Sequence, residues 1–233
     1  MVDVPISTIK WSEYFRLINS AYPPIDLFED IADPADWMLL GAAESRSNAR
    51  IAETIGNIDL IPPERRVGGA GSSYVMAPFT HVSEDKTGRF HDGTFGAFYA
   101  ADSFETALFE TIHHMQKFYS ETNQSAGWLS DFRELIGQID AIMTDIAGEG
   151  FDELMNENDY SASQAFARDM KSKGSNGIIY RSVRNQGGIC FAAFYPDVMS
   201  IPGQGRHVRY HWNGSCVNMI KDLNTNQIFK VED

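Results

Sequence analysis

The chain has 233 residues, of which 43% are hydrophobic and 12% aromatic, so it can bury a sizeable core and is not a disordered polymer. Its 19 basic residues against 32 acidic ones give a formal net charge of −13, which argues against nucleic acid as a direct partner. Two cysteines, a start without a signal-peptide pattern and no apolar run long enough to span a membrane favour a reduced, cytoplasmic setting without membrane contact.

The first 60 residues have the apolar spacing of helices. Tyr14, Phe15 and Ile18 fall near one helical face, and a longer helix is predicted over residues 33–56. Nothing in this region is typical of a catalytic or binding site. We expect residues 1–62 to form a helical N-terminal extension, either a layer on the core or a docking surface, and residues 63–233 to form the main domain.

The next elements bring the first candidate acid. Strands are predicted over residues 74–80 and 95–101, followed by a helix to residue 119 with Asp102 as its N-cap and Glu105 completing a capping box. Glu110 on this helix is flanked by apolar residues, so it is either partly buried, where it needs partners, or an ordinary surface carboxylate.

The second half of the chain alternates strands with one helix. We predict one or two strands in 128–140, a helix from Ser161 to Gly174, and further strands over 178–180, 189–195, 207–212 and 228–231. The fold class is therefore α+β, with mixed or antiparallel sheets and surrounding helices.

A polar turn joins the two buried strands at 178–180 and 189–195. It contains Ser182, Arg184 and Asn185, and by residue types alone it is either a surface loop or part of a site.

Several kinds of chemistry are poorly supported. A hydrolase using a metal held by His91 with His113 or His114 is an open alternative, but no His-Glu-x-x-His or paired Cys-x-x-Cys pattern supports it, and we expect no metal. Cys190 lies in an apolar strand, which would hide a nucleophile and raise its pKa. There is no Gly-x-Ser-x-Gly elbow for a serine hydrolase.

Four residues remain that together suit one reaction: Arg89, Tyr99, Glu110 and Ser182. An arginine can bind a phosphate, a tyrosine can pack on a planar ring, and a carboxylate can stabilise a sugar cation while a glycosidic bond breaks. Breaking the nicotinamide–ribose bond of NAD needs all of these, although residue types alone leave other reactions open.

Three segments resemble the RES-domain toxins of bacterial Xre–RES toxin–antitoxin pairs. They are GRFHDGTFGAFYA at 88–100, ETALFETIHH at 105–114 and RSVRNQGGIC at 181–190, and the resemblance runs from about residue 77 to residue 199. The family's arginine, glutamate and serine correspond to Arg89, Glu110 and Ser182. This chain has Phe90-His91 where the family often has Trp-Asn.

The resemblance implies an ADP-ribosyltransferase-like fold that uses NAD as co-substrate, with Arg89, Tyr99, Glu110 and Ser182 as catalytic residues. It also implies that Ser182 and Asn185 bind the nicotinamide end of NAD, with His91 as a further contact. Arg184 is equally open to a structural and a catalytic role.

The implied function is that of a toxin that transfers ADP-ribose to a target protein, with phosphoribosyl pyrophosphate synthetase as a candidate target. An Xre/ParS-like antitoxin is expected to block the active site. The alternatives are a toxin that degrades NAD by hydrolysis or phosphorolysis, and a non-catalytic binding module. The presence of Arg89 and Glu110 argues against the binding module.

Overall fold

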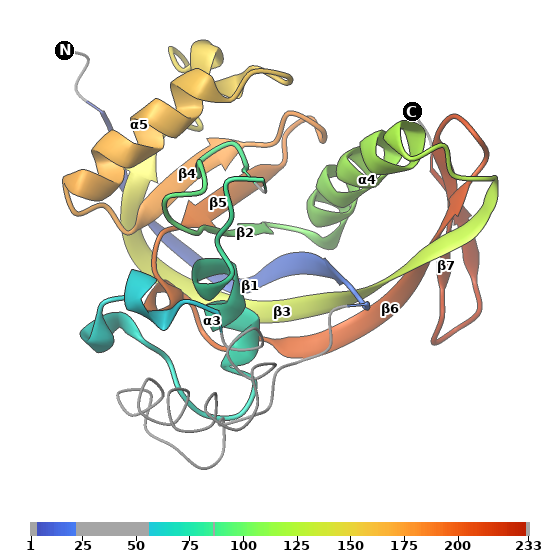
Figure 1. The fold of residues 1–233 in the computed structure, drawn as a ribbon, viewed down its shortest axis with the longest axis horizontal. Helices are drawn as coiled ribbons and strands as arrows, with labels where there is room; N and C mark the ends of the chain where they lie inside the picture. Colours follow the sequence, from blue (N-terminus) through green and yellow to red (C-terminus); the bar gives the residue numbers. More distant parts are fainter. Residues whose placement is uncertain (1–3, 22–55, 86, 232–233) are drawn as a thin grey trace.

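The computed structural model describes residues 4–21, 56–85 and 87–231, and within them eight strands form one mixed sheet ordered β1-β2-β5-β4-β3-β6-β7-β8 (Figure 1). The strands are β1 (Ile6–Asn19), β2 (Phe98–Ala101), β3 (Gly127–Asp145), β4 (Gly177–Arg181), β5 (Ile189–Ala193), β6 (Gly203–Trp212), β7 (Val217–Asp222) and β8 (Ile228–Lys230). Only the pairing of β3 with β4 is parallel among these strands.

The long strand β3 organises the sheet. β1 pairs with it from Ile6 opposite Thr144 to Asn19 opposite Phe132, and β6 pairs with its first half. Because β1 also contacts β2, the pairings return on themselves, and β1, β2, β5, β4 and β3 form a closed circle as in a small barrel. Figure 1 shows β3 and β6 lying side by side in a curved part of the sheet, with α4 on its concave side.

Three α-helices cover the sheet in the described residues: α3 (Ser73–Thr80), α4 (Phe104–Glu121) and α5 (Ser161–Ser172). Helices α3 and α5 pack on opposite faces of β5, because successive strand residues point to opposite sides. Phe191 packs in the core beside α3, and the next residue, Ala192, packs in the core beside α5. Helix α4 packs on a third apolar group, from β3, β6 and β7. Short 3-10 turns complete the described elements at Ile58–Leu60, Pro63–Arg65, Asp152–Met155 and Pro196–Val198.

No helix among the described residues is long and apolar enough to cross a membrane.

The helical prediction for the N-terminus is wrong for residues 6–19, which form β1 within the main sheet. The misleading feature is a shift of register between Trp11 and Tyr14. Such an irregularity breaks the strict alternation of a strand, so the buried side chains of Ile9, Tyr14 and Leu17 have uneven spacing. The predicted helix at 33–56 lies almost wholly outside the described residues.

Residues 74–80 were predicted to be a strand, but they belong to helix α3. Its buried residues are Val75, Met76, Phe79 and Thr80, a helical spacing that puts one stripe against the sheet. Pro78 lies inside this short helix, where proline is unusual, which is why local propensity misled the prediction.

The caps of the other helices are each shifted by one residue. Ser103 caps α4, with its hydroxyl accepting the Thr106 N–H at 3.2 Å. The predicted cap Asp102 instead exchanges hydrogen bonds with Ile189, so it extends the pairing of β2 with β5. Ser161 is the first residue of α5 and Tyr160 is its N-cap.

The other predicted strands are confirmed, and so is the helix that starts near Ser161. Strands occur at the predicted places around 98–101, 127–145, 177–181, 189–193, 203–212 and 228–230, and Gly174 with φ of 84° follows the end of α5. The mixed sheet with surrounding helices is also confirmed. Strand β7 was not predicted.

Tyr14 tests whether β1 is part of the core. Its ring is fully buried in edge contact with Phe98 and Phe191, its hydroxyl donates to the Ser200 carbonyl at 2.9 Å, and a Cβ at Gly137 would come within 2.5 Å of the ring. We expect Tyr14→Ala to lower the free energy of unfolding by about 3–5 kcal/mol, measured by denaturant titration.

The matched control is Glu13→Ala, whose side chain is exposed on the same strand, with an expected change within about 0.5 kcal/mol. If both variants unfold at the same denaturant concentration, the packing of β1 described here is incorrect.

Candidate active site

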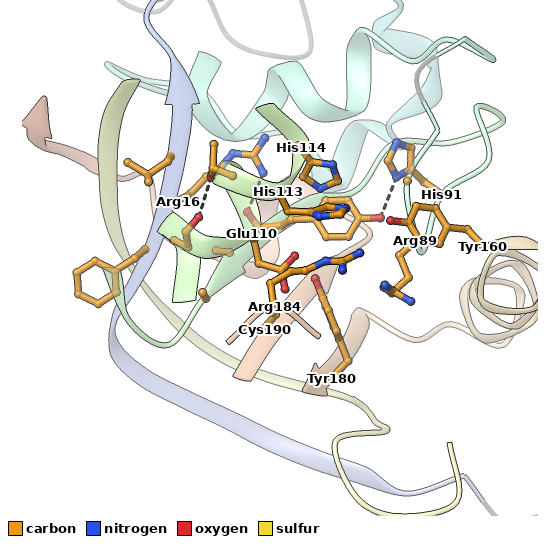
Figure 2. A pocket seen from close by; sticks show the side chains of 18 of the residues that line it. Arg16, Arg89, His91, Glu110, His113, His114, Tyr160, Tyr180, Arg184 and Cys190 are labelled. Carbon is orange, nitrogen blue, oxygen red and sulfur yellow. Dashed lines mark hydrogen bonds between the residues drawn. The ribbon is translucent and has the colours of Figure 1, made fainter. Parts of the chain in front are cut away.

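A cavity of about 310 Å³ lies where β1, β2 and α4 meet the polar turn after β4 and the residue preceding α5 (Figure 2). It brings together residues that are far apart in the sequence. The charged and polar side chains that line it include Arg16, Arg89, His91, Tyr99, Glu110, Thr111, His113, His114, Tyr160, Tyr180 and Arg184.

Arg89 is fixed in the cavity wall by backbone carbonyls. Its side chain is largely buried, and Nη1 donates hydrogen bonds to the carbonyl oxygens of Leu154 at 3.1 Å and Asn156 at 2.7 Å. The guanidinium also lies 4.8 Å from the ring centre of Tyr160. No carboxylate pairs with Arg89 among the described residues, so its positive charge is available to an anion.

Tyr99 and His91 form a hydrogen-bonded pair beside Arg89. The Tyr99 hydroxyl accepts the Phe90 N–H at 2.9 Å and shares a hydrogen bond of 2.9 Å with Nδ1 of His91 (Figure 2). Gly88 permits this arrangement, because a Cβ there would come within 2.4 Å of the His91 ring. Burial raises the pKa of the Tyr99 phenol, so it remains a neutral hydroxyl at physiological pH.

Glu110 is held by the polar turn. The Ser182 hydroxyl donates to Oε1 of Glu110 at 2.6 Å and accepts the backbone N–H groups of Arg184 at 3.1 Å and Asn185 at 3.0 Å. The single proton of this hydroxyl is therefore directed at the carboxylate. The side-chain amide of Asn185 donates to the Thr106 hydroxyl on the same helix as Glu110, at 2.9 Å.

Arg16 reaches the cavity from β1. Its Nη1 donates to the carbonyl oxygen of Tyr99 at 2.7 Å, and its guanidinium lies 4.5 Å from the ring centre of Phe98. Its buried Nε atom has no hydrogen-bond partner within the described part of the chain. Burial lowers the pKa of Arg16 to about 10, so the group is still protonated at neutral pH.

Arg184 is the third cation of the cavity. Its Nη1 pairs with the Glu157 carboxylate at 2.5 Å, and Nη2 donates to the Glu157 carbonyl at 3.3 Å. Arg16, Arg89 and Arg184 together face the one carboxylate that lines the cavity, Glu110. The cavity is thus locally positive in a chain with net charge −13, which suits an anionic ligand.

Two adjacent histidines line the same wall. The rings of His113 and His114 lie 5.6 Å apart in edge contact. Burial, with Arg184 and His114 nearby, lowers the pKa of His113 to about 4, so this ring is neutral at physiological pH. Across the described residues, no group of three or more His, Cys, Asp or Glu side chains is placed to hold a metal ion.

The structure brings together most of the predicted site residues but not all of them. Arg89, His91, Tyr99 and Glu110 line the cavity, whereas Ser182 and Asn185 are absent from its lining. Ser182 contacts Glu110, and Asn185 contacts Thr106. No sequence motif indicated that Arg16, Tyr160 and Tyr180 would line the cavity. For Arg16, the run of β-branched and aromatic residues in 6–19 was the signal of a strand, but nothing indicated which side chains would meet α4.

Comparison with known proteins gives a family match, one protein of similar sequence and one solved structure. The model of the RES domain family matches residues 63–213. "Uncharacterized protein y4oC" of Sinorhizobium fredii (strain NBRC 101917 / NGR234) is 27% identical over 209 residues, which are 89% of this chain and 86% of that protein. The crystal structure of the M. tuberculosis MbcT–MbcA toxin–antitoxin complex is similar at 13% identity and a TM-score of 0.45, over 89% of this chain and 87% of that one.

The electrostatics of the cavity can be tested through His113. In the unliganded protein its ring should titrate near pH 4, and Arg184→Gln should raise this pKa because a neighbouring positive charge is removed. The measurement is an NMR titration of the histidine ring protons. Because the folded pKa lies below the usual value of about 6.5, the stability that this group contributes falls as pH drops from about 6.5 towards 4.

Arg181→Gln is the control, since Arg181 is on the same strand–turn unit but does not line the cavity. A wild-type His113 that titrates at its ordinary value would contradict the burial described here, and an equal shift in both arginine variants would remove the specific link to Arg184.

Proposed function

The chain belongs to the RES-domain family, and we propose that it cleaves the nicotinamide–ribose bond of NAD and transfers the ADP-ribose. The observation that carries this proposal is that Arg89, Tyr99 and Glu110, which the RES-like segments supply, surround one locally positive cavity. The fold we propose for the site is ADP-ribosyltransferase-like, as the resemblance implies.

The arginines suit the diphosphate of a dinucleotide. A diphosphate carries two negative charges, and guanidinium groups bind phosphate oxygens through directed, charge-assisted hydrogen bonds. Arg89 and Arg16 are anchored by backbone carbonyls, so neither needs to leave a carboxylate before it binds an anion. The cavity volume of about 310 Å³ is at the small end of ligand sites, which fits the nicotinamide, ribose and diphosphate better than the whole dinucleotide.

Glu110 suits the developing sugar cation. When the bond between C1″ and the nicotinamide nitrogen breaks, the bonding electrons leave with nicotinamide, which becomes neutral, and the ribose becomes oxocarbenium-like. A fixed carboxylate stabilises that positive charge more than it stabilises the ground state. The acceptor atom then bonds to C1″ and releases its proton. The role we propose for Ser182 is positional, because its hydroxyl orients Glu110 and does not line the cavity.

Tyr99 and Tyr180 supply aromatic surface beside the reacting centre. Both line the cavity, and burial raises the pKa of each phenol, so they stay neutral at physiological pH. A neutral aromatic ring can pack against nicotinamide and exclude water from the bond that breaks. His91 then acts by fixing the Tyr99 hydroxyl.

We propose a toxin whose acceptor is a protein, with water and phosphate as alternatives. The family resemblance is the support for the toxin, and for an Xre-type antitoxin that covers the cavity. Strand β1 is part of the sheet, so residues 6–19 do not form a separate docking surface for a target protein. The net charge of −13 implies that any DNA contact of such a pair belongs to the antitoxin.

Replacing the carboxylate tests the reaction directly. Glu110→Gln should lower the rate of nicotinamide release from NAD by about 10²-fold or more, because a preorganised charge at the reacting centre has that order of effect. Binding of NAD should change much less, since the arginines are intact. Chromatographic detection of nicotinamide gives the rate, and calorimetry gives the affinity.

Glu105→Gln is the matched control, because Glu105 is exposed on the same helix and lines no part of the cavity. Wild-type protein that neither binds NAD nor releases nicotinamide, with or without cell lysate, would refute the proposed reaction. A loss of only a few-fold in Glu110→Gln would show that the charge of Glu110 does not stabilise the breaking bond.

The acceptor can be identified in one incubation. NAD labelled in its adenylate part is added to wild-type protein with lysate, and labelled protein, free ADP-ribose and ADP-ribose 1″-phosphate are measured together. Label on a protein band is the expected result. Fast loss of NAD without a labelled band would exclude the protein acceptor, and addition of phosphate then separates hydrolysis from phosphorolysis by the product formed.

A further inference from the structure

Residues 151–160 form a segment at the cavity that three arginines hold. Arg89 donates to the carbonyls of Leu154 and Asn156, Arg184 pairs with Glu157, and Arg181 pairs with Asp152. Arg89 and Arg184 line the cavity, whereas Arg181 does not. Two cations that face the site are therefore bound to one stretch of chain.

The contact of Arg184 differs from that of Arg89. Arg89 is bound to carbonyl oxygens, which leave its charge uncompensated, but Arg184 is bound to a carboxylate, which neutralises it. The two partners are also unequally exposed: 12% of the Arg184 side chain is accessible to solvent, against 57% of the Glu157 side chain. The cation is fixed in the wall, and its counter-ion comes from the solvent side.

The part of the segment around Glu157 is exposed to solvent. Met155 is its one buried residue between Phe151 and Tyr160, and residues 156–159 are all exposed. An exposed carboxylate that leaves its partner regains hydration at little cost, and such ion pairs contribute little stability. The Glu157 carboxylate can therefore separate from Arg184 without disturbing the core.

From these contacts we propose that Glu157 is an internal competitor for the anionic ligand. In the free protein its carboxylate neutralises Arg184, and a phosphate group of the ligand displaces it and takes over the same N–H donors. Carboxylate and phosphate oxygens accept the same paired hydrogen bonds from a guanidinium. The N–H donors of Arg184 therefore have acceptors both before and after the exchange. The identity of the ligand as a diphosphate rests on the proposed function. The competition itself rests on the geometry.

The consequence is a lowered affinity for the ligand. A group that must leave before binding reduces the observed affinity by the free energy of its own contact. An ordinary structural latch predicts the opposite sign, because loosening the segment would then disorder the cavity and weaken binding. The sign of the change in affinity therefore separates the two roles.

The experiment measures binding of inorganic pyrophosphate by calorimetry at low salt. Glu157→Gln removes the competing charge, and we expect it to bind pyrophosphate about two- to fivefold more tightly than wild type, the range for a partly exposed ion pair. Arg184→Gln should bind at least about tenfold more weakly, since it loses a charge-assisted contact. In the double variant Glu157→Gln should have no further effect, because its partner is gone.

Asp152→Asn is the matched control. It removes one negative charge from the same segment, but its partner Arg181 lies outside the cavity lining, so a general change in the field of the protein would affect both variants equally. Its affinity for pyrophosphate should stay at the wild-type value. Thermal unfolding of each variant checks that all of them are folded.

The proposal is overturned if Glu157→Gln binds pyrophosphate no more tightly than Asp152→Asn, if Arg184→Gln binds as well as wild type, or if no variant binds pyrophosphate at all. Release of nicotinamide from NAD by the wild-type protein is measured in parallel. Tighter pyrophosphate binding without NAD cleavage would sustain the competition and refute the reaction, whereas NAD cleavage with unchanged pyrophosphate affinity in Glu157→Gln would do the reverse.

Discussion

The pairing of β1 with β3 is the constraint on which the site depends. It closes the circle of strands, buries Tyr14 against β2 and β5, and carries Arg16 to the cavity wall. Strand β3 also pairs with β6 and β4, so β1 is joined to the strand that connects the two ends of the sheet. A shift of one residue in this pairing would turn Arg16 to the other face and remove a cation from the cavity.

The three cavity arginines show how an acidic protein can keep positive charge in a cavity. Arg89 and Arg16 donate to backbone carbonyls, which fix the direction of each guanidinium without cancelling its charge. Of the three, Arg184 alone is paired with a carboxylate, that of the exposed residue Glu157. Among the described residues, two of these cations are therefore fixed without a paired carboxylate, and the third is paired with Glu157.

The polar turn after β4 acts on the site through Glu110. Ser182 uses its proton for the carboxylate and its lone pairs for two backbone amides, so the conformation of the turn and the position of Glu110 are coupled. The turn also places Arg184 at the cavity. The positions of Glu110 and Arg184 therefore both depend on residues 182–185.

The sequence by itself determined strands β2 to β6, strand β8 and helices α4 and α5, because periodicity and turn residues act over neighbouring positions. Its motifs selected Arg89, Tyr99 and Glu110. Only the tertiary structure decided that residues 6–19 form a central strand, since the register shift at Trp11 hides the alternation. The tertiary structure also shows that Ser182 contacts Glu110 without lining the cavity, that Arg16 lines the cavity, and that Glu157 pairs with Arg184. These depend on which side chains meet across long sequence separations, and that is fixed by strand pairing and packing, which no local pattern encodes.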